Sequence, residues 1–172
     1  DIQYFDTSGS KHGSLKMPAK GTISGLSGKK EESSSYFSFT NFIQPAQIFK
    51  LDLETNSYKK FWEEELNNFN EEEYESRMVF YPSKDGTLIP LHIAHKKDTL
   101  INSSSPVLLY GYGGFNISLL PRFSKGFLAW MNQGGVFALA NLRGGSEFGS
   151  KWHEQGMLLN KQNVFDDFAY AA

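Results

Sequence analysis

Two uninterrupted apolar runs constrain the fold of this 172-residue chain more than any other feature. They are "PVLLYG" (106–111) and "VFALA" (136–140), and between them lies "SKGFLAWMNQGG", which has the pattern of a short amphipathic helix with Ser124 as N-cap and Gly134 at its end. Strands that are apolar on both faces are buried on both sides, and a helix between two of them is typical of a parallel α/β sheet. We therefore predict an α/β domain in the second half of the chain.

The first part of the chain has a different pattern. Short β-type runs are separated by clusters of Gly, Ser, Lys and Asn, and they read "IQYF", "GTISGLSG", "SYFSFTNF", "QIFKLDL" and "YKKFW". In the third run Phe37, Phe39 and Phe42 interleave with Ser and Thr, and in the fourth Ile48 and Leu51 are offset by polar neighbours, as in half-buried strands. Residues 54–57 have the composition of a hairpin turn. These signals predict a β-meander or one blade of a propeller.

A glutamate-rich run separates the two patterns, with seven glutamates between Glu63 and Glu75. Such a run could hold a metal or a basic partner, but a solvated linker is the commoner case. After it, "RMVFYPSKDGTLIPLHIAHKK" predicts two strands around a turn at residues 84–86, and Pro90 indicates that the second is an edge strand or carries a bulge. We expect a β domain with its linker over residues 1–75 and an α/β domain over residues 76–172.

Composition argues against several classes of partner. Seventeen Lys and Arg against 19 Asp and Glu give a formal charge of -2, which supplies no overall attraction for nucleic acid or an anionic membrane. The chain has no cysteine, in keeping with a cytoplasmic location, and its four histidines are too scattered to predict a zinc site. No apolar run approaches the ~20 residues of a membrane helix. We expect no metal, no organic cofactor, no nucleic acid and no membrane.

A glycine loop, "GYGGFN" (111–116), follows the first apolar run at the place where α/β sheets bind ligands. A dinucleotide fingerprint fails, because Asn116 replaces its last glycine and no Asp or Glu occurs between Thr99 and Ser146. A phosphate loop fails as well, because no Gly-Lys-Ser or Gly-Lys-Thr is present. Two interpretations remain open: an oxyanion hole to which Tyr112 donates its phenolic hydroxyl, or a tight loop whose tyrosines only pack.

The last ten residues, "NVFDDFAYAA", predict a helix without a stop signal, and we expect the chain to be an internal piece of a longer protein. Asn163 and Asp166 form an N-cap-like pair. One predicted helical face carries Phe165, Phe168, Ala169 and Ala172. No G-x-S-x-G nucleophile motif occurs anywhere in the chain.

From about Met78 to its end the chain resembles the prolyl oligopeptidase family of serine peptidases. The resemblance is carried by "FYPSKDGTLIPLHIAHKK", "LLYGYGGFNIS", "GGVFALANLRGGSEFG" and "NKQNVFDDF". The first 75 residues fit the last part of the β-propeller of that family. The resemblance implies a mixed fold, in which the end of a β-propeller is followed by the start of a three-layer α/β-hydrolase domain.

The resemblance also implies an activity and residue roles. The protein would hydrolyse short peptides on the carboxyl side of proline by acyl transfer to a serine, without a cofactor. Tyr112 would be the oxyanion donor, and Phe115 would line the apolar pocket that receives the proline ring. Arg143 would anchor its loop on Asp166 or Asp167.

The Ser, Asp and His triad of the family lies outside this chain, so the chain alone is expected to cleave nothing. The alternative is a non-enzymatic interaction module, or a truncated relative, in which the β region and the glutamate run bind a partner and the glycine loop is only structural.

Overall fold

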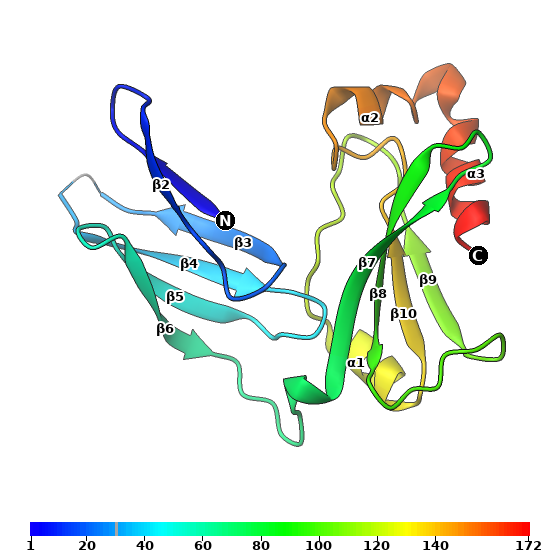
Figure 1. Cartoon of the computed structure of the whole chain (residues 1–172), viewed down its shortest axis with the longest axis horizontal. Coiled ribbons are helices and arrows are strands. Elements are labelled where there is room, and N and C mark those ends of the chain that lie inside the picture. Colours follow the sequence, from blue (N-terminus) through cyan, green and yellow to red (C-terminus); the bar gives the residue numbers. More distant parts are fainter. Residues whose placement is uncertain (30) are drawn as a thin grey trace. The chain divides into compact units, whose positions relative to one another are not determined.

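The computed structural model describes residues 1–29 and 31–172, which form two compact units. The N-terminal unit comprises Asp1–Asn67 with Pro121–Phe123, and the C-terminal unit comprises Asn68–Leu120 with Ser124–Ala172. Figure 1 shows the elements of both. The chain passes between the units after Asn67, inside the glutamate-rich run, and again on either side of Pro121–Phe123. None of the described helices has both the length and the apolar character to cross a membrane.

The N-terminal unit contains six strands in two antiparallel sheets. A hairpin is formed by β1 (Ile2–Phe5) and β2 (Lys11–Leu15), and a four-stranded meander runs β3 (Thr22–Ser27), β4 (Ser34–Thr40), β5 (Gln47–Asp52) and β6 (Ser57–Glu63). The predicted β-type runs all form strands, and the turn between β5 and β6 falls at residues 53–56. The strand β2 was not predicted, because "KHGSL" has neither β-branched nor alternating apolar residues.

The core of the N-terminal unit is a set of aromatic and aliphatic side chains on one face of the meander. Phe37 and Phe39 of β4 pack with Phe49 and Leu51 of β5, and the rings of Phe37 and Phe49 stack with centroids 5.2 Å apart. Strand alternation places Phe49 and Leu51 on the same face. The prediction of a half-buried strand is confirmed for β5, whose buried face carries Leu51, while Ile48 lies on the other face and is partly buried.

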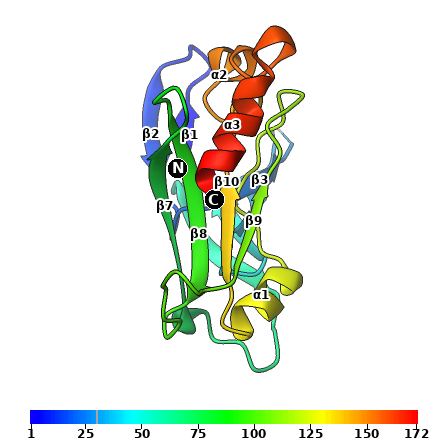
Figure 2. The same ribbon diagram turned by 90° about the vertical axis from the view of Figure 1, so that its right-hand side faces the viewer.

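The C-terminal unit is built on one four-stranded sheet in the order β7-β8-β10-β9 (Figure 2). Its strands are β7 (Tyr74–Pro82), β8 (Leu88–Lys96), β9 (Val107–Gly111) and β10 (Val136–Ala140). Its helices are α1 (Lys125–Asn132), α2 (Ser150–Glu154) and α3 (Gln162–Ala171), with single 3₁₀ turns at Glu71–Glu73 and Leu158–Asn160. The prediction of two parallel strands joined by a helix is confirmed, but only β9 and β10 are parallel, so the sheet is mixed.

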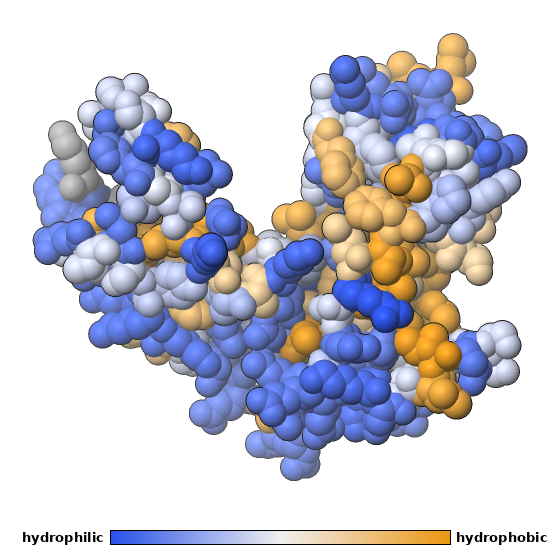
Figure 3. Space-filling view, in the orientation of Figure 1, coloured by the Kyte–Doolittle hydropathy of each residue, from blue (hydrophilic) through white to orange (hydrophobic). Residues whose placement is uncertain are grey.

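The two apolar strands differ in burial. All of β10 is buried, as predicted, whereas β9 is the edge strand of the sheet and remains largely exposed. Val107 is 55% exposed and Leu108 is 41% exposed. Figure 3 shows hydrophobic side chains at the surface of this unit on the side where β9 runs. The expectation that β9 is buried on both faces is thus wrong for this chain, because nothing in the described residues covers its outer edge.

Pro90 lies in an inner strand, so the expectation of an edge strand is wrong. The strand β8 pairs with β7 on one side and with β10 on the other, but its ladder with β10 covers only Leu91–Ala94. The carbonyl oxygen of Pro90 accepts from the Asn141 N–H at 3.0 Å, beyond the end of β10. In a strand the N–H and C=O of one residue point to the same side. The backbone N–H that a non-proline residue would have here would also point past the end of β10. Its absence therefore removes no hydrogen bond between β8 and β10.

The C-terminal helix begins earlier and buries a different face than predicted. Its N-cap is Lys161, with no side-chain cap, so Asn163 lies inside the helix. The buried positions of α3 are Val164 and Asp167, while Phe165 is 57% exposed. The true buried stripe contains an aspartate, and for this reason the apolar pattern alone selects the wrong face.

Candidate functional site

The glycine loop leaves the carboxyl end of β9, and two of its three glycines are required by close packing. A Cβ at Gly111 would lie 2.9 Å from the Leu142 side chain. Gly113 has a φ of +59°, and a Cβ there would lie 2.7 Å from the Arg143 carbonyl oxygen and collide with Val164. Neither position accepts another residue without displacing its neighbours. The glycines thus bring this loop against the segment that follows β10.

The residues after these glycines adopt left-handed backbone conformations. Phe115 has a φ of 52° and Asn116 a φ of 57°. Asparagine tolerates this region, but a phenylalanine there costs about 1–2 kcal/mol. Two backbone hydrogen bonds hold the turn: Asn116 N–H donates to Gly144 O at 3.1 Å, and Ile117 N–H donates to Gly114 O at 3.1 Å. Strain of this kind is concentrated at binding and catalytic sites.

The two side chains predicted for the site, Tyr112 and Phe115, lie on this loop and are exposed. Tyr112 is 43% exposed, and its hydroxyl forms no hydrogen bond to any residue in the described ranges. Phe115 is 84% exposed. The tyrosine is therefore partly exposed, and its hydroxyl is not engaged by another side chain or backbone group of the described residues. Their roles toward a substrate remain predictions.

A second glycine loop, at residues 143–149 after β10, supports the first. Gly144 has a φ of +93°, and its carbonyl accepts both the Asn116 N–H and a ring N–H of His153, whose Nδ1 lies 2.7 Å away. Since a carbonyl only accepts, Nδ1 of His153 carries a proton. The histidine thus connects α2 to the second glycine loop.

Glu147 ties the end of the first glycine loop to the second. Its Oε1 accepts from Leu119 N–H at 2.8 Å and from the Asn141 side-chain amide at 3.1 Å. The same amide donates to Leu119 O at 2.9 Å, and the hydroxyls of Ser118 and Ser146 lie 2.7 Å apart. The sequence analysis missed this group, because nothing in the local pattern relates residues 118–119 to residues 141–147.

A buried charge cluster around Arg143 fixes the second loop on α3 and on the β7–β8 hairpin. The guanidinium is 2.6 Å from Asp167 and 2.6 Å from Asp85, and Arg143 and Asp167 are both almost fully buried. Ser83 donates its hydroxyl to Asp167 at 2.6 Å. The prediction that Arg143 anchors its loop on this helix is confirmed for Asp167. Asp166 instead lies 3.4 Å from Lys84.

The cluster shifts the proton affinities of its members. The hydrogen bond from Arg143 lowers the pKa of Asp85 to about 2. The hydrogen bond to Asp167 raises the pKa of Arg143, and burial raises the pKa of Tyr81, whose hydroxyl donates to the backbone oxygen of Asp167. Arg143 and Asp85 therefore stay charged at neutral pH. The cluster is a structural anchor, and Asp85 is a member that the sequence analysis missed.

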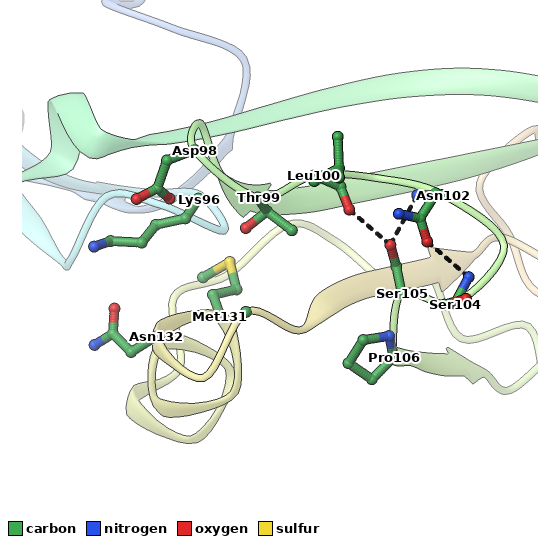
Figure 4. Close-up of a pocket in the computed structure, with 11 residues that line it drawn as sticks. Lys96, Asp98, Thr99, Leu100, Asn102, Ser104, Ser105, Pro106, Met131 and Asn132 are labelled. Atoms are coloured by element: carbon green, nitrogen blue, oxygen red, sulfur yellow. Dashed lines mark hydrogen bonds between the residues drawn. The ribbon is translucent and has the colours of Figure 1, made fainter.

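The described residues offer no cluster of three or more His, Asp or Glu that could hold a metal ion. A cavity of about 480 Å³ lies at the opposite end of β9, between the loop at residues 97–106 and the end of α1 (Figure 4). Two of its polar side chains form hydrogen bonds within the loop: Ser105 donates to Leu100 O at 3.0 Å, and Asn102 accepts from Ser104 N–H at 2.8 Å. This cavity has no connection with the glycine loops.

Comparison with known protein families gives two matches. Residues 121–172 match the prolyl oligopeptidase family of peptidase S9, and residues 1–64 match the N-terminal β-propeller domain of prolyl oligopeptidase. The second match assigns residues 1–64 to the propeller, and the first assigns residues 121–172 to the start of the peptidase domain, which has the α/β-hydrolase fold. The predicted fold class is confirmed.

Individual relatives agree. The chain is 44% identical over 170 residues to a prolyl endopeptidase of Elizabethkingia meningoseptica, covering 99% of the chain and 24% of that protein. It is 40% identical to a prolyl endopeptidase of Dictyostelium discoideum, covering 99% of the chain and 23% of that protein. Among solved structures, a prolyl endopeptidase superposes with a TM-score of 0.93 at 40% identity, covering 98% of this chain and 25% of its own. Oligopeptidase B of Leishmania major superposes with a TM-score of 0.82 at 30% identity, covering 92% and 22%. The chain spans about a quarter of the length of the relatives it matches.

Proposed function

This chain belongs to the prolyl oligopeptidase family, and on that premise we propose that it is part of a serine endopeptidase that hydrolyses short peptides on the carboxyl side of proline. The proposal is supported by relatives named prolyl endopeptidase and by the glycine loop that carries Tyr112. The nucleophile, acid and base would come from the rest of the protein. The chain by itself would be inactive.

The observation that carries the proposal is the free hydroxyl of Tyr112 on a loop whose backbone is fixed by glycine packing. When a serine oxygen attacks a peptide carbonyl, the carbonyl oxygen becomes negatively charged. A hydrogen-bond donor that is already held in place stabilises that charge more in the transition state than in the ground state. Removal of such a donor costs about 3 kcal/mol of the barrier.

Phe115 is proposed to contact the proline ring. Proline has no N–H to recognise, so a site selects it by shape and by apolar contact. Phe115 follows Tyr112 by three residues in the chain. It has a left-handed backbone and an exposed apolar side chain. Strained backbone of this kind is found at ligand-binding sites, in keeping with a role of Phe115 in substrate binding.

The test is Tyr112→Phe in the intact protein, assayed with a short proline-containing peptide. We expect kcat to fall about 100-fold and KM to stay within about twofold, since the lost interaction forms only in the transition state. Tyr36→Phe is the matched control, because Tyr36 is an exposed tyrosine of β4 in the other unit. Unchanged turnover of the Tyr112 variant would remove this residue from the mechanism.

A further inference from the structure

We propose that Lys161 is a positioning residue for Tyr112, and that its ammonium group fixes the glycine pair that follows the tyrosine. This inference rests on the proposed function for its catalytic part. Lys161 Nζ donates to the carbonyl oxygen of Gly113 at 2.7 Å, and this bond is partly buried. It connects the start of α3 with a loop 48 residues earlier in the chain.

The position of Lys161 on its helix is electrostatically unfavourable. It is the N-cap residue of α3, at the end where the backbone N–H groups make the helix positive, and a cation is disfavoured there. Within the described ranges no carboxylate lies at ion-pair distance from its ammonium group, and its other interaction is with the Phe165 ring, 5.8 Å away. Apart from the contact with the Phe165 ring, α3 therefore offers this ammonium group no favourable partner. The hydrogen bond to Gly113 O gives the ammonium group the polar partner that the helix does not provide.

The carbonyl that Lys161 holds belongs to a pair of glycines. Gly113 and Gly114 are consecutive glycines, and glycine has the widest range of backbone conformations. Because a peptide group is planar, fixing the oxygen of Gly113 also fixes the orientation of the Gly113–Gly114 peptide plane. Tyr112 precedes this pair directly. This hydrogen bond therefore acts together with the close packing of Gly113 to restrict the backbone directly after the tyrosine.

The ammonium group also lies close to the tyrosine ring. The point where a Cβ of Gly114 would sit is 3.7 Å from Lys161 Nζ and 4.0 Å from Cζ of Tyr112, the carbon that bears the hydroxyl. The ammonium and that carbon are therefore no more than about 8 Å apart, a range at which a partly buried charge still acts on its neighbours. The positive charge has the sign that favours an oxyanion beside the hydroxyl.

The test compares Lys161→Met and Lys161→Arg in the intact protein with Lys151→Met, which changes an exposed lysine of α2 in the same way. The first measurement is hydrogen exchange of the segment 112–120 and does not depend on activity. We expect the protected N–H groups of Asn116 and Ile117 to exchange about tenfold faster in Lys161→Met and at the original rate in the other two variants. Unchanged exchange in Lys161→Met would overturn the proposal. Should that variant fold poorly, Lys161→Gln serves in its place.

The second measurement is peptidase activity. We expect Lys161→Met to lower kcat about tenfold with KM within about twofold, and Lys161→Arg to restore most of it. In a Tyr112→Phe background the same change should have little further effect, because both residues act on one interaction. An equal effect in both backgrounds would contradict a positioning role. If the intact protein cleaves no proline peptide, the proposed function fails, while the exchange measurement still decides whether Lys161 holds the loop.

Discussion

Replacing Arg143 by methionine should destabilise the C-terminal unit by about 4 kcal/mol. Methionine fills a similar volume but leaves the carboxylate of Asp167 buried, with no positive partner. Removing one member of a buried ion pair costs about 3–5 kcal/mol, because the remaining charge is uncompensated. Asp85 is half exposed and adds less than about 1 kcal/mol. Domains are stable by only about 5–15 kcal/mol, so the loss is large.

The assay is urea denaturation of the intact protein at pH 7, followed by tryptophan fluorescence. Trp152 is a local reporter, because its indole N–H donates to Leu142 O at 3.1 Å, next to Arg143. Arg77→Met, at an exposed arginine of β7, is the matched control and should change the free energy of unfolding by less than about 0.5 kcal/mol.

A double variant identifies the cause. Arg143→Met combined with Asp167→Leu removes both charges, and we expect it to regain most of the lost stability, as replaced buried ion pairs do elsewhere. The reasoning would be refuted if Arg143→Met cost less than about 1 kcal/mol, or if the double variant were no more stable than the single one.

Three further predictions concern the same unit. The pKa of Asp85 is lowered to about 2, so its pairing stabilises the fold above a pH of about 4, and this contribution is lost as the pH falls toward 2. In urea titrations, the free energy of unfolding should therefore fall less between pH 5 and pH 2.5 in Asp85→Asn than in the original protein. Because Phe115 has a left-handed backbone, Phe115→Gly should be more stable than Phe115→Ala by about 1 kcal/mol in urea denaturation, and equal stabilities would argue against strain at this residue. Gly113→Ala should lower the free energy of unfolding, derived from Tm, by over about 2 kcal/mol more than Gly134→Ala does. Both glycines have positive φ, but only Gly113 has neighbouring atoms where the Cβ would lie. Similar losses in the two variants would show that the packing around Gly113 is loose.

Features of the fold that depend on local pattern could be predicted from the sequence. The β7–β8 hairpin follows from two strand patterns around the turn at residues 84–86, and the pairing of β9 with β10 follows from two apolar runs separated by a helix. The glycine loop was located at the end of β9 by the same reasoning. A cytoplasmic location and the domain boundary at residue 75 stay predictions.

Features that depend on distant contacts could not be predicted from the local pattern; the contact of Arg143 with Asp167 was expected only through the resemblance to the family. The exposure of β9 follows from its place at the edge of the sheet, and composition does not reveal which strand is at the edge. The buried face of α3 could not be recognised from its apolar pattern, because this face contains Asp167. A charged residue is buried there only because it has a partner, Arg143, 24 residues away. Lys161 and Glu147 are ordinary charged residues in sequence, and their contacts with the first glycine loop exist only in the folded chain.

The helix α3 takes part both in holding the loop that carries Tyr112 and in the buried ion pair of the unit, two roles that different elements fill in many proteins. Its first residues reach the loop that carries Tyr112 through Lys161, and less than two turns later Asp167 reaches the hairpin through Arg143. Any rotation of this helix about its axis would move both attachments together. A change to the loop that carries Tyr112 therefore has to keep the register of α3 unchanged, and a stabilising change within this helix has to leave the contact of Lys161 with that loop in place.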